Sequence, residues 1–367
     1  MLLIFTDCFS TTYASARSKF VETAQAAGAR LSQYAHPSAA GEFGEALSID
    51  VARLGNLSAD RQLPVISGTH GQEGYAGAAA QVGWLLSSEA SPVLKDVGVL
   101  LVHGLNPYGF SHGSRTTENN VDLNRNFVDH TRPYPENPGY ETLHHALTPA
   151  VWSRESFDSV SRAEADLIEK EGADALFNAL VAGQYSHPDG LLFGGNGREW
   201  SNVMLERILA EHFGHASKVA FIEWHTGIGD YGKPFFLSFN EPHSAELRQA
   251  ALWWGGRIRC ASSRDGTAGL SWTRLLRRTG VSSRSASCWS CHRVRHTGPG
   301  SGCGRDASGP PAALSWRSRQ CGDTDPDAGG PAGLAQPCVL SMAAGGNRAR
   351  RGTYRCGLER TRAVAKL

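Results

Sequence analysis

The chain has 367 residues, of which 41% are hydrophobic and 19% are charged, and its formal net charge is +1. This length and composition suit one large α/β domain or two smaller ones, and the near-zero charge favours no particular partner, nucleic acid included. No apolar stretch approaches the roughly 18 residues of a membrane span. Residues 1–7 lack the basic region and the long apolar segment of a secretory signal peptide. We therefore expect a cytoplasmic protein without a membrane partner.

The composition changes abruptly near Trp254. Residues 1–253 hold 17 Lys+Arg and 29 Asp+Glu, whereas residues 254–367 hold 19 Lys+Arg and 6 Asp+Glu. The second segment also has seven of the eight cysteines, none of the 14 phenylalanines and a single lysine. We therefore divide the chain into a domain of residues 1–253 and an irregular tail of residues 254–367 that is rich in Arg, Cys and Gly.

Three explanations compete for the tail. A nucleic-acid-binding arm would mix Lys with Arg and place aromatic residues for stacking. A disulfide-rich secreted module conflicts with the odd cysteine count and the missing signal peptide. We favour a third hypothesis, in which the tail is GC-rich coding DNA translated in a shifted frame, or is disordered. The sequence Cys-Trp-Ser-Cys-His at residues 288–292, which matches a c-type haem attachment site, is then accidental.

Before the tail, apolar periodicity predicts strands that alternate with helices. In chain order we expect a helix over residues 11–27, strands over 31–35, 47–54 and 63–66, a helix over 75–87 and a strand over 97–103. A proline-rich surface loop over 130–150 and a long helical region over 155–183, which covers one face of the sheet, should follow. The last expected elements are a turn at 187–190, a helix over 199–212 and a strand over 218–227. This alternation predicts a mainly parallel sheet with helices on both sides. Ligands of such folds bind beyond the carboxyl ends of the strands.

Three side chains near such strand ends are candidate metal ligands. His70 and Glu73 lie on a glycine-rich turn directly after the apolar run 63–66. His225 follows the apolar run 218–222, 152 residues after Glu73. Two nitrogen ligands and one carboxylate are a ligand set that zinc accepts, with a fourth position left for water. The alternative is a polar loop in which His70 and Glu73 cap the next helix, together with a structural histidine at position 225.

Residues 114–127 (SRTTENNVDLNRNF) form the second candidate segment. They are too polar for a core element and carry too few charges for a simple solvated face. Asn124 and Arg125 can present a planar fork of donors to a carboxylate, a bidentate geometry that lysine cannot offer. The alternative is a loop that is cross-linked by Asn and Asp side chains and by an Arg–Asp salt bridge.

Taken together, these motifs resemble the zinc carboxypeptidase superfamily, and most closely its bacterial branch of uncharacterised domains. The order that carries the resemblance is His-Gly-x-Glu-Gly at 70–74, Asn-Pro-x-Gly at 106–109, Arg115 ahead of Val-Asp-Leu-Asn-Arg-Asn-Phe at 121–127, and a strand followed by His-Thr-Gly at 225–227. The resemblance covers about residues 1–253. It implies a three-layer α/β/α fold around a mixed, mainly parallel sheet.

The resemblance also implies roles for six residues. His70, Glu73 and His225 would bind one zinc ion, Asn124 and Arg125 would hold a substrate carboxylate, and Arg115 would polarise the scissile carbonyl. A water molecule on such a zinc ion has a pKa of about 7, and each donor to the developing oxyanion contributes roughly 3 kcal/mol. The expected reaction is hydrolysis of a peptide or amide bond next to a free carboxylate, in a small peptide or an N-acyl amino acid.

One part of the superfamily's site is missing from this sequence. Its general base is a Glu on a late strand, whereas only Glu241, Glu246 and Glu359 follow His225 here, and none of them has the expected spacing and surroundings. Glu223 should face the same way as His225 because side chains alternate along a strand, but we do not assign it as the base. A second function therefore stays open, in which the protein binds zinc or a carboxylate without catalysis.

Overall fold

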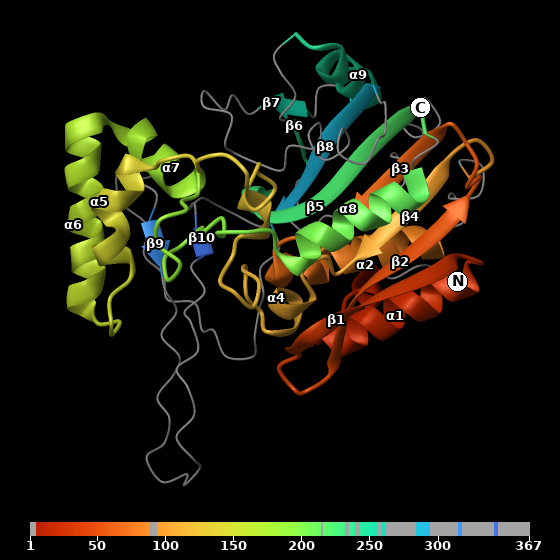
Figure 1. Cartoon of the computed structure of the whole chain (residues 1–367), viewed down its shortest axis with the longest axis horizontal. Coiled ribbons are helices and arrows are strands. Elements are labelled where there is room, and N and C mark those ends of the chain that lie inside the picture. Colours follow the sequence, from red (N-terminus) through yellow and green to blue (C-terminus); the bar gives the residue numbers. More distant parts are fainter. Residues whose placement is uncertain are drawn as a thin grey trace, which may run out of the picture.

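The fold is a mixed β-sheet with helices packed on both of its faces (Figure 1). It is seen in a computed structural model that describes residues 5–87, 94–213, 216–231, 235–238 and 243–254, and strands at 258–260, 284–293, 315–317 and 341–343. The expected three-layer α/β/α class is confirmed. Among the described residues, no helix combines the length and the apolar character needed to cross a lipid bilayer.

The large sheet has the strand order β1-β2-β4-β3-β5-β8-β6-β7. Its strands are β1 (Arg30–Ala40), β2 (Ala46–Gly55), β3 (Arg61–Ile66), β4 (Gly98–His103), β5 (Lys218–Tyr231), β6 (Phe235–Ser238), β7 (Ile258–Cys260) and β8 (Arg284–Arg293). The central strands β4, β3, β5 and β8 run parallel to one another, whereas β1, β2 and β4 are joined by antiparallel pairs. Strand β6 pairs antiparallel with β8 and parallel with β7. Strands β9 (Ser315–Arg317) and β10 (Ser341–Ala343) form a separate antiparallel pair.

The helices are α1 (Tyr13–Ala26), α2 (Gly74–Leu86), α4 (Pro107–Ser111), α5 (Pro138–Leu147), α6 (Arg154–Glu171), α7 (Ala173–Val181), α8 (Trp200–Phe213) and α9 (Ala245–Trp254), with short 3-10 turns η1 (Phe5–Cys8), η2 (Gly71–Glu73) and η3 (Leu123–Arg125). Several helices, among them α1, α4, α5 and α6, begin where a local side chain satisfies a free backbone N–H group. The Thr12 hydroxyl accepts from the Ser15 amide at the start of α1. Asn137 caps α5 in the same way, and Pro138 occupies a first-turn position where its missing N–H costs nothing.

The two faces of the sheet have separate cores. Alternate strand residues pack against α8 on one face, and they are Ile49, Val51, Ile66, Leu100, Val102, Val219 and Phe221. The residues between them pack with α1 and α2 on the other face, and they include Ala52, Leu54, Leu63, Val99, Leu101 and Ala220. Strand β4 is therefore buried along its whole length, as its continuous apolar run predicts for a central strand.

Helices α5, α6 and α7 pack on one another and form a helical module beside the sheet (Figure 1). Their shared core consists of Tyr140, Leu143, Leu147, Val160, Leu167, Leu176, Ala179 and Leu180. Two predictions were therefore wrong. Residues 130–150 contain a helix rather than only a loop, and residues 155–183 do not cover a face of the sheet. In α6 only Val160 and Leu167 are buried. They form an apolar stripe that is wide enough to pack against neighbouring helices but too narrow to cover a flat sheet.

The predicted strands and the helices over 11–27, 75–87 and 199–212 all occur, with bounds that differ by a few residues. Strand β1 continues five residues past its predicted end, and β5 continues to Tyr231, so that His225 lies within the strand rather than at its end. The proposed tail lies mostly outside the described residues. Its division from the domain at residue 253, and its origin in a shifted frame or in disorder, therefore stay predictions. The Cys-Trp-Ser-Cys-His sequence falls within β8, which pairs with β5.

Candidate metal centre

The loop after β3 carries two of the three expected ligands and is shaped by glycine. Gly68 has a φ of +73°, which a side chain would strain. At Gly71 a Cβ atom would lie 1.9 Å from the carbonyl carbon of Gly109 and 2.1 Å from the amide nitrogen of Phe110. The backbones of η2 and α4 therefore touch, and this contact holds His70 and Glu73 in place.

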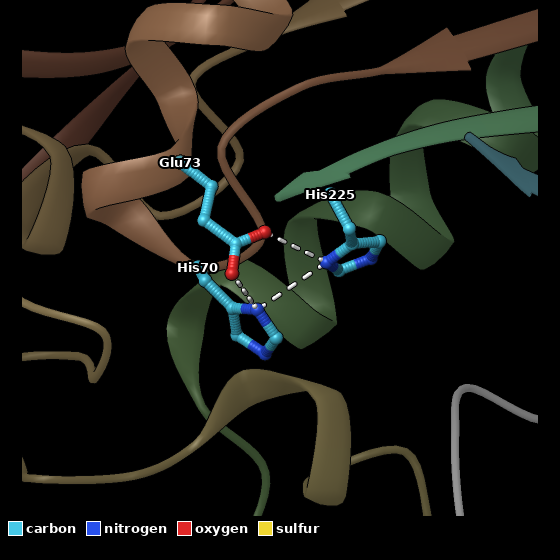
Figure 2. A group of neighbouring side chains, drawn as sticks. All are labelled: His70, Glu73 and His225. Atoms are coloured by element: carbon cyan, nitrogen blue, oxygen red, sulfur yellow. Dashed lines mark hydrogen bonds and ion pairs between the residues drawn. The ribbon is translucent and has the colours of Figure 1, made fainter. Parts of the chain in front are cut away.

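The third ligand comes from the neighbouring strand. Strands β3 and β5 are parallel, and Ile66 pairs with Glu223. The loop that leaves β3 therefore lies beside His225, two residues further along β5. Figure 2 shows the three side chains converging from the loop, the start of α2 and β5. All three are buried, which brings together the His70, Glu73 and His225 set expected from the sequence.

The separations of the three donor groups suit a tetrahedral ion. Nδ1 of His70 lies 3.0 Å from Oε1 of Glu73 and 3.3 Å from Nδ1 of His225. Nδ1 of His225 lies 3.1 Å from Oε2 of Glu73. Zinc bonds of about 2.0–2.1 Å place two tetrahedral ligand atoms about 3.3 Å apart. The residues present therefore fit a zinc ion in number, in chemical type and in spacing.

The alternative, in which His70 and Glu73 cap the next helix, is wrong. Neither side chain makes a capping hydrogen bond at η2 or α2. Glu73 instead accepts from the backbone amide of Thr226 at 2.8 Å, across the boundary between the loop and β5. This bond holds the carboxylate between the two imidazoles.

Buried carboxylates contact the outer nitrogen of each imidazole. Nε2 of His70 lies 3.2 Å from Oδ1 of Asp122, and Nε2 of His225 lies 3.2 Å from Oε1 of Glu223. The Thr69 hydroxyl donates to the same Glu223 oxygen at 2.6 Å. Such partners orient metal-binding imidazoles and make them more basic. Both Nδ1 atoms are thereby directed toward Glu73.

Burial and neighbouring charges shift the pKa values of the acids and the imidazoles in this site. Burial opposes ionisation of Glu73, but His70 and His225 hold the pKa of its carboxyl below the usual range. Burial likewise opposes ionisation of Asp122, but Arg115 and His70 keep its pKa well below normal. Burial lowers the pKa of His225, whereas Glu223 and Glu73 raise it, with a net value of about 9. Because a metal ion binds neutral imidazole, an ion that bound at this site would displace protons.

Arg115 lies at the rim of this cluster. Its Nε donates to Oδ2 of Asp122 at 2.9 Å, and its Nη1 lies 3.8 Å from Oε1 of Glu73. The side chain is 35% exposed, so its remaining donors can reach a bound molecule. The Arg–Asp salt bridge expected for a cross-linked loop is present, and it places the guanidinium next to the ligand set.

Asn124 and Arg125 lie on η3, deeper in the protein than their expected role implies. Both are buried. The Arg125 guanidinium donates to the carbonyl of Val181 at 3.1 Å through Nε and at 2.5 Å through Nη2. Among the described residues Arg125 makes no ion pair, although the Asp122 carboxylate is near enough to favour its charged form. Burial lowers the pKa of this guanidinium, as expected for a cation removed from water.

Sequence reasoning missed the role of Asp122, which connects the two candidate segments. Its carboxylate contacts His70 and Arg115, and it accepts from the Asn124 amide at 3.0 Å. The signal was available, because Asp122 lies within the Val-Asp-Leu-Asn-Arg-Asn-Phe segment that carries the resemblance. Sequence spacing alone does not say that a residue 52 positions after His70 contacts it.

One protein-family model matches most of this chain. A family model described as "Protein of unknown function (DUF2817)" matches residues 9–288, a range that extends 35 residues past residue 253. Among curated proteins, none matches this chain.

Similar solved structures include carboxypeptidase A from Helicoverpa armigera, with 12% identity, a TM-score of 0.45 and coverage of 78% of this chain and 66% of that chain. Bovine thrombin-activatable fibrinolysis inhibitor has 12% identity, a TM-score of 0.44 and coverage of 79% and 87%. A metallo-carboxypeptidase from Burkholderia cenocepacia has 14% identity, a TM-score of 0.37 and coverage of 76% and 59%. The chain thus spans less than two thirds of the insect and Burkholderia proteins.

Proposed function

The chain belongs to the DUF2817 family, and we propose that it binds one zinc ion at this centre and hydrolyses a peptide or amide bond next to a free carboxylate. One observation carries the proposal. His70, Glu73 and His225 present three buried donor groups at tetrahedral spacing. Each imidazole is also backed by a carboxylate, which is the arrangement that fixes metal-binding histidines.

The residues around the ligands suit this reaction. A bound zinc ion would supply a Lewis acid and would acidify a water molecule in its open position. Arg115 directs guanidinium donors to the rim of the site and is held there by Asp122. Donors fixed in advance beside a carbonyl oxygen stabilise the negative charge that develops on it. Arg115 therefore serves as the electrostatic partner of the scissile carbonyl.

The preference for a free carboxylate rests on Arg125. A buried guanidinium without an ion-pair partner is costly, and among the described residues the Arg125 guanidinium hydrogen-bonds to backbone carbonyl groups only. A substrate carboxylate would supply the missing negative charge through a bidentate pair. Small peptides and N-acyl amino acids both carry such a group, and Asn124 precedes Arg125 on the same turn.

A second candidate function is zinc or carboxylate binding without turnover. The observation that favours it is the lack of a base. In the described part of the chain, the carboxylates that contact the imidazoles are Glu73, Glu223 and Asp122, and each is already engaged as a ligand or as an orienting partner. The sequence of β8, which follows β5 in the sheet, contains no Glu. The two candidates share the metal site and differ only in turnover.

The experiment measures zinc content by elemental analysis, together with hydrolysis of short peptides and N-acyl amino acids, for the full chain with and without chelator. We expect His70→Ala and His225→Ala each to lower the zinc content by one ion per chain and to abolish chelator-sensitive hydrolysis. His112→Ala is the control, because this histidine lies at the end of the adjacent helix α4, where its side chain hydrogen-bonds the Tyr108 carbonyl and stacks on the Tyr108 ring. Unchanged zinc in either ligand variant would refute the site. Bound zinc without turnover in the parent chain would select the second candidate.

A further inference from the structure

A second group of side chains with the chemistry of metal ligands lies beside the helical module. His144 is on α5, and His187 and Asp189 are on the turn that follows α7. Each of these residues offers one donor atom within 4.8 Å of the others. None of them contributes to the metal centre between β3 and β5. The group therefore needs an explanation of its own.

The two imidazoles and the carboxylates are closely packed. The rings of His144 and His187 stack with centroids 3.6 Å apart. Nε2 of His144 lies 3.7 Å from Oδ1 of Asp189. Nε2 of His187 lies 2.7 Å from Oε2 of Glu141, which adds a second carboxylate. His144 is buried, whereas the Asp189 side chain is 75% exposed, so the group opens to solvent on one side.

The turn that carries His187 and Asp189 is held in place from several directions. The side chain of Gln184 accepts from the His187 amide at 2.8 Å and donates to the His187 carbonyl at 2.8 Å. Asn120 donates to the carbonyls of Pro188 and Gly190. A Cβ atom at Gly190 would lie 2.5 Å from the Tyr140 hydroxyl and 3.2 Å from Nδ1 of His144. The turn thus lies directly on α5, and its potential ligands face His144 without any rearrangement of the backbone.

We propose that His144, His187 and Asp189 form a second metal site, which binds a divalent transition-metal ion that prefers imidazole, such as Zn²⁺ or Co²⁺. Two imidazoles and a carboxylate match the ligand preference of these ions. Glu141 supports His187 from its outer side, as carboxylates commonly do for metal-binding histidines. The ring planes now differ by only 16°, so the more exposed His187 turns out of the stack until both nitrogen lone pairs meet at the ion.

An ion at this position would join α5 to the loop that supports Arg125. The carbonyl of Val181 accepts from the Arg125 guanidinium, and the Tyr185 hydroxyl donates to the Arg125 carbonyl at 2.7 Å. Both supporting residues immediately flank the loop that leads to His187. The second ion therefore has a structural role, in that it fastens this loop to α5, and it takes no part in bond cleavage.

The test measures bound zinc per chain after dialysis against Zn²⁺, and then the visible spectrum after exchange with Co²⁺. We expect two ions for the parent chain and one for His187→Asn and for Asp189→Asn. Asp189 is largely exposed, so its variant should fold normally. The control is His145→Asn, which removes an exposed histidine next to His144 on the same helix and should retain both ions.

The two sites can be separated by their variants. His70→Ala removes the ion at the first centre, and His187→Asn removes the other, so failure of one assignment leaves the other testable. The Co²⁺ spectrum of the His70→Ala chain should report the second site alone. If His187→Asn and Asp189→Asn bind as many ions as the parent, with an unchanged Kd, the second site is refuted and the stacked rings are held by packing and hydrogen bonds only.

Discussion

At the scale of single residues, two carboxylates outside the proposed ligand set support the candidate metal centre. Asp122 contacts His70 and Arg115 at once, and Glu223 does the same for His225 and Thr69. Each of these acids is completely buried. A buried carboxylate is tolerated only where donors satisfy it, so the pairs Asp122–His70 and Glu223–His225 are also the groups that hold the ligands in position.

Asp122→Asn tests this dependence. The amide keeps the shape of the side chain but removes the charge that orients His70 and anchors Arg115. We expect the zinc affinity of the first centre to fall roughly 10- to 100-fold, measured by competition with a chelator of known affinity. Asp129→Asn is the control, because the Asp129–Arg132 pair is exposed on the same segment and exposed pairs contribute little. Equal affinities for the two variants would contradict the assigned role.

At the scale of secondary-structure elements, close contact between η2 and α4 positions the ligand loop. The contact is backbone against backbone at Gly71, with no side chain that could move aside. The loop is also tied to α4 by its own hydrogen bonds, such as the Asn106 amide to the Gly68 carbonyl at 2.8 Å. Displacement of α4 would therefore displace both His70 and Glu73.

Gly71→Ala should show this coupling. The added methyl group would overlap Gly109 and Phe110, so the loop has to move outward. We expect the free energy of unfolding to fall by roughly 1–3 kcal/mol, the usual cost of overpacking, and zinc binding at the first centre to be lost. Gly197→Ala is a matched control because nothing lies within 4 Å of a Cβ atom there. Denaturant titration gives the free energy of unfolding of both variants, and elemental analysis gives their zinc content. Normal zinc content in the Gly71→Ala variant would contradict the proposed coupling between α4 and the ligand loop.

At the scale of the whole molecule, a histidine is enclosed near the junction of the sheet and its helices. His103 ends β4, stacks on Phe20 of α1 with ring centroids 4.5 Å apart, and lies near Phe110 of α4. Among the described residues, neither of its ring nitrogens has a hydrogen-bond partner. Burial lowers the pKa of His103 to about 4; Asp50 acts in the opposite direction, and Arg17 lowers the pKa further.

Because the pKa of His103 is lowered in the folded protein, we expect the free energy of unfolding to decrease in acid. The unfolded chain takes up the proton near pH 6.5, whereas the folded chain resists it until about pH 4. Stability is therefore retained above pH 6.5 and falls as the pH drops from 6.5 to 4, by on the order of 3 kcal/mol from this group. His103→Leu should flatten the pH dependence of the unfolding free energy in this window. His145→Asn, at an exposed position, should leave it unchanged, and identical slopes for all three chains would contradict the prediction.

Much of the fold and the clustering of His70, Glu73 and His225 could be predicted from local pattern and motif order. The apolar run of β4 and the alternation in β2 and β5 reflect burial on both faces of the sheet, and the His-Gly-x-Glu-Gly turn follows its strand as expected. The helical module could not be predicted in the same way. The amphipathic pattern of α6 indicates that one stripe of the helix is buried, but it does not indicate which part of the protein packs against that stripe. The prolines near residue 138 stand at the start of a helix, but in the sequence alone they look the same as the prolines of a loop.

The sequence by itself determined which side chains are available as ligands, the strand–loop–helix context of His70 and Glu73, and the lack of a late Glu with the expected spacing. These features depend on residue type and on neighbours a few positions away. Only the tertiary structure decided that Asp122 contacts His70, that Arg125 is buried, and that His144 meets His187 and Asp189. These contacts join residues 43 to 52 positions apart, and they exist only because strand pairing and helix packing bring distant segments together, which no local pattern encodes.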